Sequence, residues 1–274
     1  MHESDEPRPE IDVVEAAYDA LDAGDPETAL SLIGRALVAD ADDPVLHFLL
    51  GVARLELDDP VAAVEPLERA VAIDPDDAEF RARLAETLYR CCRFEDAAPH
   101  ARSATDSDPR LALGHHVAGL LAERRGRNDE ADAAFARATK LEPEAFPRPV
   151  RLDENAFARH LAEAIDRLPS PFRDALAGVA VTVESVPDEA LLLDAHPPLD
   201  PELLGLFAGL PLPDRGPLGP GGELPGRIYL FQRSLERFAE DEDDLVEQIG
   251  VTLRHELGHY LGLDEEEIEA AGHG

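Results

Sequence analysis

The sequence predicts two domains, an all-α domain of repeated helix pairs followed by a small α+β domain. Three observations lead to this prediction. The first half of the 274 residues repeats with a period of 34, a proline- and arginine-rich stretch then breaks the period, and one long amphipathic helix lies near the C-terminus. We place the repeats at residues 10–145, a linker at 146–152 and the second domain at 153–274.

Prolines and alanines carry the period. Pro75, Pro109 and Pro143 lie 34 residues apart, and alanines keep the same interval in two series, Ala29, Ala63, Ala97 and Ala131, and Ala36, Ala70, Ala104 and Ala138. Small residues let two helices cross closely, and a proline ends the second helix before the next repeat begins. The pattern predicts four helix pairs, at 10–43, 44–77, 78–111 and 112–145.

This order of small, large and proline positions resembles the tetratricopeptide repeat. The resemblance implies a curved surface that holds peptides or partner proteins and does no chemistry itself. Two interpretations stay open for the arginines of the third repeat, which either line a groove or balance neighbouring acids: Arg81, Arg83, Arg90 and Arg93. The pair His115-His116 has no acidic or thiol neighbours at ligand spacing, so we predict no metal site there.

The second domain is predicted as short elements around a long loop. Helices are expected from Asp153, at Ser170-Pro171, where serine caps and proline opens the helix, and from Asp200-Pro201 to Phe207. Strands are expected at 179–183 and 227–231. Residues 209–226 contain eleven glycines and prolines in eighteen positions, which predicts a loop. The last helix is expected to begin near Glu242.

That helix carries the segment H-E-L-G-H-Y-L-G, residues 255–262, which matches the H-E-x-x-H pattern of zinc peptidases. Four residues apart, His255 and His259 lie on one helical face and can reach one metal ion. Glu256 is rotated away from them, so it can act on a water held by the metal. We therefore predict zinc ligands at His255 and His259 and a general base at Glu256.

A third ligand is expected after Gly262, which permits a sharp turn, including one with positive φ. Glu265 stands at the position where the longer H-E-x-x-H-x-x-G-x-x-[HDE] pattern places this ligand. Spacing favours Glu265, while Asp264, Glu266 and Glu269 remain open.

Residues 153–272 resemble the small bacterial zincin-like metallopeptidases, sometimes called minimal zincins. The resemblance rests on D-P-E-L-L-G-L-F, a proline- and glycine-rich loop, P-G-R-I-Y-L-F and H-E-L-G-H-Y-L-G-L-D-E-E-E, in this order. It implies a mixed α/β peptidase fold with an edge strand beside the cleft, ligands His255 and His259, the base Glu256 and the third ligand Glu265. Members often have aspartate at this last position, so glutamate departs from the pattern.

The sequence offers no single donor for a tetrahedral oxyanion, and the candidates are Tyr229, Tyr260, Arg254 and His273. The strand at 228–231 is expected to pair with an extended substrate, and the loop 209–226 to act as a lid. Because Met1 is the only methionine, the methionine turn of larger metzincins is excluded.

Composition limits the partners and the compartment. The formal charge of −34 is spread over both halves, which argues against nucleic acid and anionic membranes as partners. The two cysteines, Cys91 and Cys92, are adjacent, so no disulfide framework exists and a reducing compartment fits. The N-terminus lacks the features of a signal peptide, and no apolar run reaches membrane-spanning length. We expect a cytoplasmic protein.

These observations predict a zinc-dependent metallopeptidase, an endopeptidase acting on peptides or proteins, with a repeat domain for substrate or partner recognition. The alternative is a non-enzymatic adaptor whose second domain holds a structural metal. Glu256 separates the two, because a structural metal site does not need a carboxylate there. A hydrolase of small-molecule amides is a third possibility.

Overall fold

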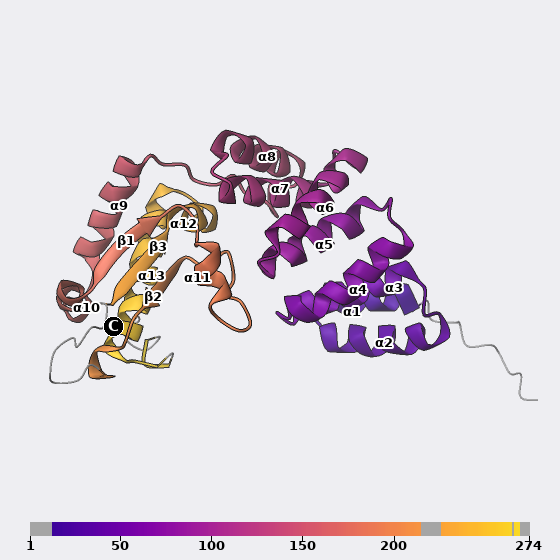
Figure 1. The fold of residues 1–274 in the computed structure, drawn as a ribbon, viewed down its shortest axis with the longest axis horizontal. Coiled ribbons are helices and arrows are strands. Elements are labelled where there is room, and N and C mark those ends of the chain that lie inside the picture. Colours follow the sequence, from indigo (N-terminus) through magenta and orange to yellow (C-terminus); the bar gives the residue numbers. More distant parts are fainter. Residues whose placement is uncertain (1–12, 215–225, 265, 269–274) are drawn as a thin grey trace, which may run out of the picture. The chain divides into compact units, whose positions relative to one another are not determined.

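The computed structural model describes residues 13–214, 226–264 and 266–268. Contacts within the chain divide it into two compact units, Met1–Leu141 and Glu142–Gly274. In the described residues, the first unit holds only helices, and the second combines helices with a short sheet (Figure 1).

The first unit consists of four helix pairs that keep the predicted period. From the second repeat on, the first helices begin 34 residues apart, at Pro44, Ala78 and Ala112. The eight helices are α1 (Val13–Asp22), α2 (Pro26–Ala39), α3 (Pro44–Glu56), α4 (Pro60–Ile73), α5 (Ala78–Arg90), α6 (Phe94–Ser107), α7 (Ala112–Arg124) and α8 (Asn128–Leu141). The prediction of an all-α repeat domain is confirmed.

Small residues bring the two helices of a repeat together, as the alanine series predicts. Ala63, Ala97 and Ala131 are fully buried. A Cβ added to Gly51 would lie 2.4 Å from Cγ of Leu67, and one added to Gly119 would lie 2.7 Å from the Phe135 ring. Glycine in the first helix therefore makes room for a large side chain of the second helix.

The turns of the repeats are periodic as well. A residue with positive φ closes the turn inside every repeat, at Gly24, Asp58, Cys92 and Gly126. Between repeats, side chains 34 residues apart donate hydrogen bonds to backbone carbonyls of the preceding turn, His47 to Ala41, Arg81 to Pro75 and His115 to Pro109. The same backbone geometry is therefore rebuilt at each step along the unit.

The second unit begins with α9 (Glu154–Arg167), which Asp153 caps, and α10 (Ser170–Ala175). Further short helices are η1 (Leu176–Gly178), α11 (Glu189–Leu193), η2 (Leu212–Asp214) and α12 (Gln232–Phe238). The long helix is α13, Glu242–Leu261, as expected from Glu242.

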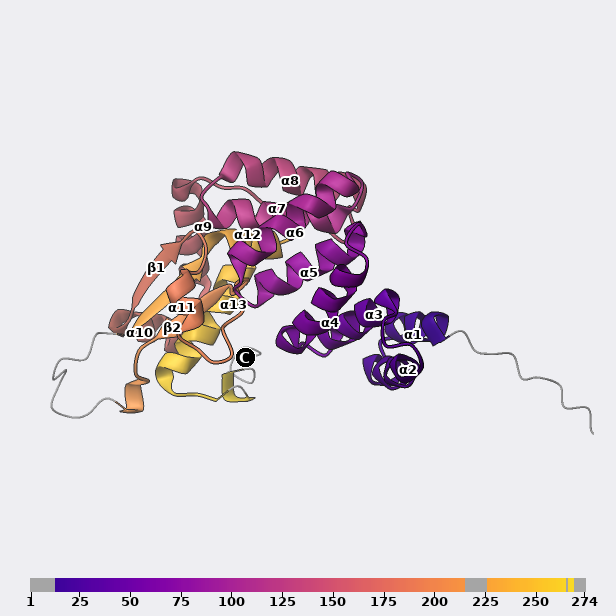
Figure 2. The same cartoon turned by 45° about the vertical axis from the view of Figure 1, so that its right-hand side comes forward.

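The sheet of the described residues has three strands, β1 (Ala180–Glu184), β2 (Gly205–Ala208) and β3 (Arg227–Phe231). Their order is β1-β3-β2, with β3 parallel to β1 and antiparallel to β2. α13 packs against β2 and β3, and α9 packs on α13 (Figure 2). The core between these layers includes Ile228, Leu230, Leu253 and Leu257, each fully buried. The small α+β class is confirmed.

Two expectations for the second unit are wrong. Residues 205–208 form β2 and not a helix, because the backbone of this segment pairs with Tyr229 and its neighbours on β3. The strand at 228–231 cannot pair with a substrate either. It is the central strand of the sheet, and both of its edges are already hydrogen bonded.

The segment expected to form a linker is bound to α12. Val150 N–H donates to the Glu236 carbonyl, 2.9 Å, and Leu152 N–H donates to Glu236 Oε1, 3.2 Å. Arg151 forms an ion pair with the same carboxylate, which is fully buried. The contact-based division of the chain falls between Leu141 and Glu142, so this segment packs as part of the second unit.

Within the described part of the chain, no helix combines the length and the hydropathy needed to cross a bilayer.

Candidate metal centre

Helix α13 places the two histidines of the motif side by side. Asp241 caps its first turn by accepting a hydrogen bond from Asp244 N–H, and Gly262 ends it. His255 and His259 lie one turn apart, both half-buried, with their Nε2 atoms 3.1 Å from each other. The two rings stand nearly perpendicular, with centroids 4.7 Å apart.

This arrangement fits two ligands of one zinc ion. Imidazole nitrogens that bind a tetrahedral zinc at about 2.0 Å lie about 3.3 Å from each other. The observed separation of the Nε2 atoms, 3.1 Å, is close to that value without any change of the helix. The histidine pair therefore suits a zinc ion.

Glu256 is held beside this pair by strand β2. Its side chain is 7% exposed, and its Oε2 accepts a hydrogen bond of 2.6 Å from Phe207 N–H. Gly205 makes this approach possible, since a Cβ there would lie 2.5 Å from Thr252 Cγ2 and 3.3 Å from Glu256 Cγ. One strand thus fixes the orientation of the carboxylate.

The histidines lie on the helix face between two other segments. Thr252 and Glu256, on one side of that face, meet β2 at Gly205. Gly258, on the other side, meets the C-terminal segment, because a Cβ there would lie 2.4 Å from Ile268 Cγ1. The 3.6-residue period puts His255 and His259 between these two contacts.

The turn after α13 has the expected left-handed geometry. Gly262 adopts φ 81°, and Leu263 N–H donates to the Gly258 carbonyl, 3.0 Å. A Cβ on Gly262 would lie 2.9 Å from Pro213 Cγ, so the start of the proline- and glycine-rich loop packs on this turn. The predicted turn at Gly262 is confirmed.

The acidic residues beyond the turn differ in what they do. Asp264 Oδ1 accepts from Glu267 N–H, and Glu267 Oε2 accepts from Asp264 N–H, which is a reciprocal capping box. Both carboxylates are engaged in this cap, and Asp264, Glu266 and Glu267 are all exposed. Glu265 and Glu269 lie outside the described residues, and the described ones contain no group of three or more side chains able to hold a metal.

The candidates for an oxyanion donor occupy different environments. Tyr260 is 3% exposed and packs edge-on against Phe207, with ring centroids 5.8 Å apart, so it belongs to the core. Tyr229 stacks on Phe231 within β3, and Arg254 is half-buried on α13. His273 lies outside the described residues.

In the first unit, the arginines of the third repeat serve its own structure. Arg81 donates to the Pro75 carbonyl, and the other three form ion pairs with acids, Arg83 with Glu86, Arg90 with Asp58, and Arg93 with Glu68 and Asp96. Arg83, Arg90 and Arg93 thus balance neighbouring acids, which is one of the two interpretations left open by the sequence.

The environment of the Cys91 thiol in the first unit does not activate it as a nucleophile. Burial raises the pKa of Cys91, although Arg93 and Arg90 oppose this shift. The reactive thiolate is therefore disfavoured at neutral pH.

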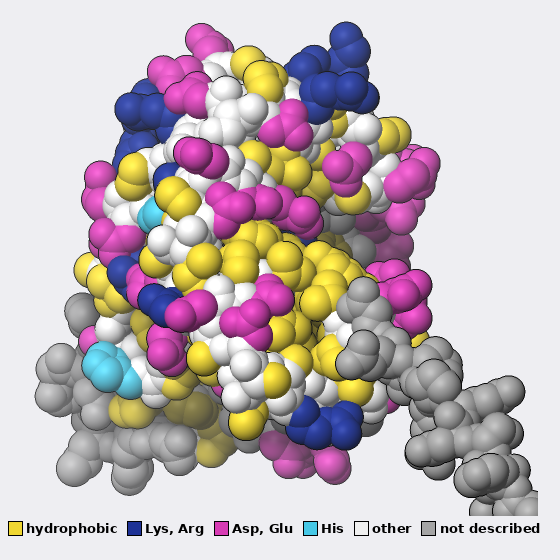
Figure 3. Space-filling view, turned by 90° about the vertical axis from the view of Figure 1, so that its right-hand side faces the viewer, with side chains coloured by type: hydrophobic (Ala, Val, Ile, Leu, Met, Phe, Trp, Pro, Cys, Tyr) yellow, Lys and Arg dark blue, Asp and Glu magenta, His cyan; other side chains and the backbone are white. Residues whose placement is uncertain are grey.

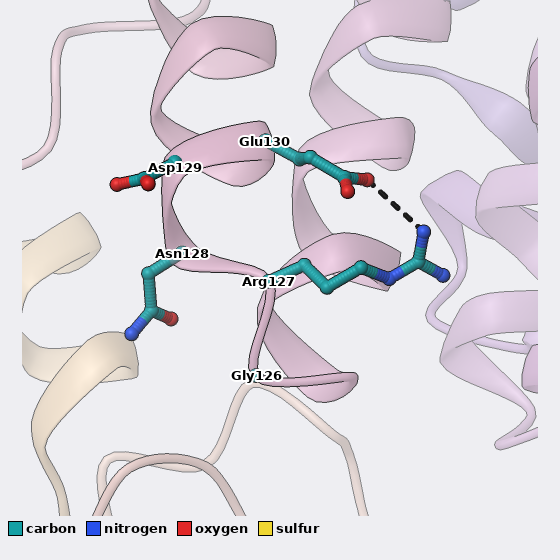
Figure 4. A pocket seen from close by; sticks show the side chains of 5 residues that line it. All are labelled: Gly126, Arg127, Asn128, Asp129 and Glu130. Carbon is teal, nitrogen blue, oxygen red and sulfur yellow. Dashed lines mark hydrogen bonds and ion pairs between the residues drawn. The ribbon is translucent and has the colours of Figure 1, made fainter.

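A shallow pocket of about 390 Å³ lies at the turn between α7 and α8. Figure 4 shows its lining, in which Arg127 pairs with Glu130 across 3.0 Å and Asn128 and Asp129 point away from that pair. The side chains do not converge on a common point. The pocket therefore offers no constellation comparable to that on α13.

Sequence patterns did not single out Gly205, Phe207 or Thr252 as parts of the site. The only signal for the first two was a short apolar run, G-L-F-A, which fits a helix as well as a strand. Their role depends on β2 lying across α13, which no local pattern records.

Comparisons with known proteins agree with this architecture. Residues 176–273 match the family model described as zincin-like metallopeptidase. Residues 14–78 and 54–123 match two models of the tetratricopeptide repeat. The chain thus carries tetratricopeptide repeats followed by a zincin-like metallopeptidase region, which confirms the resemblance and the domain order. No curated protein matches the chain.

Among solved structures, the repeats are similar to TTC0263, a thermophilic tetratricopeptide repeat protein of Thermus thermophilus. It is 25% identical over 48% of this chain and 73% of its own, with a TM-score of 0.44. A crystal structure of MamA is 19% identical over 58% of this chain and 86% of its own, with a TM-score of 0.42.

Proposed function

We propose that the second unit is a zinc-dependent endopeptidase and that the repeats recognise its substrate or a partner protein. The observation that carries the proposal is the convergence of the His255 and His259 Nε2 atoms, 3.1 Å apart, beside a buried carboxylate on the same helix. The match to the zincin-like metallopeptidase family supports it. His255, His259 and Glu265 are the proposed zinc ligands, and Glu256 is the proposed base.

The residues of this chain have separate tasks in the reaction. Zinc, when bound, supplies a Lewis acid that polarises the scissile carbonyl and lowers the pKa of water to about 7. The Glu256 carboxylate takes a proton from the attacking water and returns it to the nitrogen of the leaving amine. Phe207 N–H holds Oε2 of this carboxylate, 2.6 Å away, so the base keeps one orientation during the transfer.

Strand β2 is the proposed docking strand for an extended substrate. It lies at the end of the sheet order β1-β3-β2 and carries the N–H that holds Glu256. A peptide that adds to an edge strand gains main-chain hydrogen bonds. A peptide bound along β2 would have its scissile bond beside the Glu256 carboxylate. The sequence predicts this role for the strand at 228–231, which is the central strand of the sheet.

Zinc stoichiometry tests the proposal. Native mass spectrometry of the purified full chain should show one zinc, which is lost in His255→Ala and retained in His160→Ala on α9. The wild type should also cleave members of a peptide library, and His255→Ala should not.

Two results would count against the proposal. A wild-type chain that takes up no zinc when zinc is supplied contradicts the metal site. One stable zinc without cleavage of any library peptide contradicts the peptidase and favours the adaptor with a structural metal.

A further inference from the structure

The first helices of the repeats form one continuous layer. α1 contacts α3, α3 contacts α5, and α5 contacts α7. In repeat proteins of this kind, such a layer lines one side of the stack and presents an extended surface. Small residues of these helices, such as Ala17 and Gly51, are buried. Other positions of the same helices remain accessible.

An apolar stripe follows this layer through the first two repeats. On α3 the spacing of Val45, Phe48, Val52 and Leu55 places all four on one side of the helix. Phe48 is buried against Phe80, with centroids 4.9 Å apart, while the other three are half-buried. Thirty-four residues earlier, α1 has Val14, Tyr18 and Leu21 in equivalent positions, and Tyr18 is 42% exposed.

Acidic residues replace the apolar stripe in the third repeat and lie beside it on α3. In the third repeat the equivalent positions of Val45 and Val52 are Glu79 and Glu86. Glu56, exposed at the end of α3, lies on the same side as Val52. Burial raises the pKa of Tyr18, and the charges of Glu79 and Asp77 raise it further. We give the name first-helix face to the accessible apolar residues of this stripe and the carboxylates around it: Val14, Tyr18, Leu21, Val45, Val52, Leu55, Glu56, Glu79 and Glu86.

The acidic excess of the repeats is concentrated in the first two repeats, which also carry the apolar stripe. Residues 10–77 contain 18 acids and 3 bases, whereas residues 78–145 contain 12 acids and 11 bases. Among the exposed large hydrophobic residues described in this unit, Tyr18 lies on a first helix, whereas Val38, Leu57 and Val61 lie on α2, after α3 and on α4. Figure 3, which looks onto the side where α1–α4 lie, shows hydrophobic side chains bordered mainly by Asp and Glu.

We propose that the first-helix face docks a basic, amphipathic helix of a substrate or partner protein. The apolar side of such a helix covers the stripe, and its lysines or arginines meet the bordering carboxylates. Opposite charges also speed the encounter and exclude acidic segments. The inference rests on the recognition role proposed for the repeats and not on peptidase activity.

Fluorescence anisotropy with labelled peptides tests this docking. The probe is a peptide of about 18 residues made of Leu, Lys and Ala, with leucines on one helical side. A scrambled peptide of the same composition and a peptide with Glu in place of Lys serve as comparisons. The full chain carries Glu256→Gln to prevent cleavage, so binding is measured independently of catalysis.

We expect the amphipathic basic peptide to bind at least about tenfold more tightly than either comparison peptide. Val52→Arg should weaken the binding of this peptide by about tenfold or more. Tyr18→Arg, at a more exposed position, should have the same effect, and it replaces Val52→Arg if that variant does not fold. Val38→Arg is the matched control, because Val38 is 87% exposed on α2, and should leave the affinity unchanged.

Equal binding of the scrambled peptide would overturn the proposal, since it would mean attraction by net charge alone. Unchanged affinity in folded Val52→Arg or Tyr18→Arg would overturn it as well. If the probe does not bind while the wild-type chain cleaves library peptides, this inference is wrong and the proposed peptidase stands.

Discussion

The contacts that stabilise the first unit differ in range from those that stabilise the second unit. In the repeats, a turn residue with positive φ and a hydrogen bond to the preceding turn recur every 34 residues. In the second unit, decisive contacts occur once and join distant segments. Phe207 holds Glu256 across 49 residues, and Arg151 reaches Glu236 across 85.

The two units therefore differ in how they respond to amino-acid substitutions. A contact that a substitution removes from one repeat has equivalents in the other repeats. The residues at those equivalent positions show which second substitution can restore the packing. A damaged contact around the candidate metal centre has no such equivalents.

The largest effect is expected for Glu256→Gln. This change keeps the size of the side chain but removes the base, so cleavage should fall by at least about 100-fold while zinc stays bound. Steady-state cleavage and native mass spectrometry measure the two quantities. Glu247→Gln, on the exposed side of the same helix, should keep both. Retained turnover in Glu256→Gln would remove the role assigned to this residue.

Gly205→Ala should disturb the second unit. The new Cβ would lie 2.5 Å from Thr252 Cγ2 and 3.1 Å from the Tyr229 carbonyl oxygen, so β2 must move away from α13. We expect a loss of about 1–3 kcal/mol in the free energy of unfolding and weaker cleavage.

Gly34→Ala is the counterpart in the repeats. A Cβ on Gly34, in α2, meets nothing within 4 Å, so alanine should stabilise the helix by about 0.5–1 kcal/mol. Urea titrations of the two variants measure both changes. Equal effects of the two substitutions would contradict the contrast between the units.

Gly51→Ala should destabilise the repeats by about 1–3 kcal/mol, because its Cβ would lie 2.4 Å from Cγ of Leu67. The first repeat has Ala17 and Ile33 at the equivalent positions. The double variant Gly51→Ala with Leu67→Ile copies that pair and should recover most of the loss. Urea unfolding of both variants checks this, and a double variant no more stable than the single one would show that the repeats are not equivalent.

For Asp58→Gly we expect an effect as small as that of Gly34→Ala. Asp58 adopts φ 55° at the turn position where two other repeats have Gly24 and Gly126. Glycine removes the cost of this conformation and should raise the free energy of unfolding by about 0.5–1 kcal/mol, although an exposed ion pair with Arg90 is lost. Asp58→Ala loses the same ion pair without relieving the backbone and should be less stable than the wild type.

Much of the fold could be predicted because its signals are local. The period of 34 placed the repeat helices, and the apolar spacing from Leu245 to Tyr260 placed α13 with His255, Glu256 and His259 in fixed relation. A helix defines which side chains share a face, so the pairing of the histidines followed from their spacing alone.

The strands were harder to predict for a physical reason. Residues 205–208 form a strand because β3, whose paired residues run from Arg227 to Leu230 much further along the chain, supplies the hydrogen bonds. Likewise, 227–231 is recognisable as a strand, but its neighbours in the sheet decide whether it is central or at an edge. Burial of Phe207 and Leu206 alone does not distinguish these cases.

The helix pairs, the long motif helix, the left-handed turn at Gly262 and the acidic excess of the first two repeats follow from residue spacing or composition. The position of β2 beside the motif and the hydrogen bond from Phe207 N–H to Glu256 depend on tertiary packing. The mutual cap of Asp264 and Glu267 is likewise seen only in the folded chain. These features join segments whose proximity arises only when the sheet and α13 pack together.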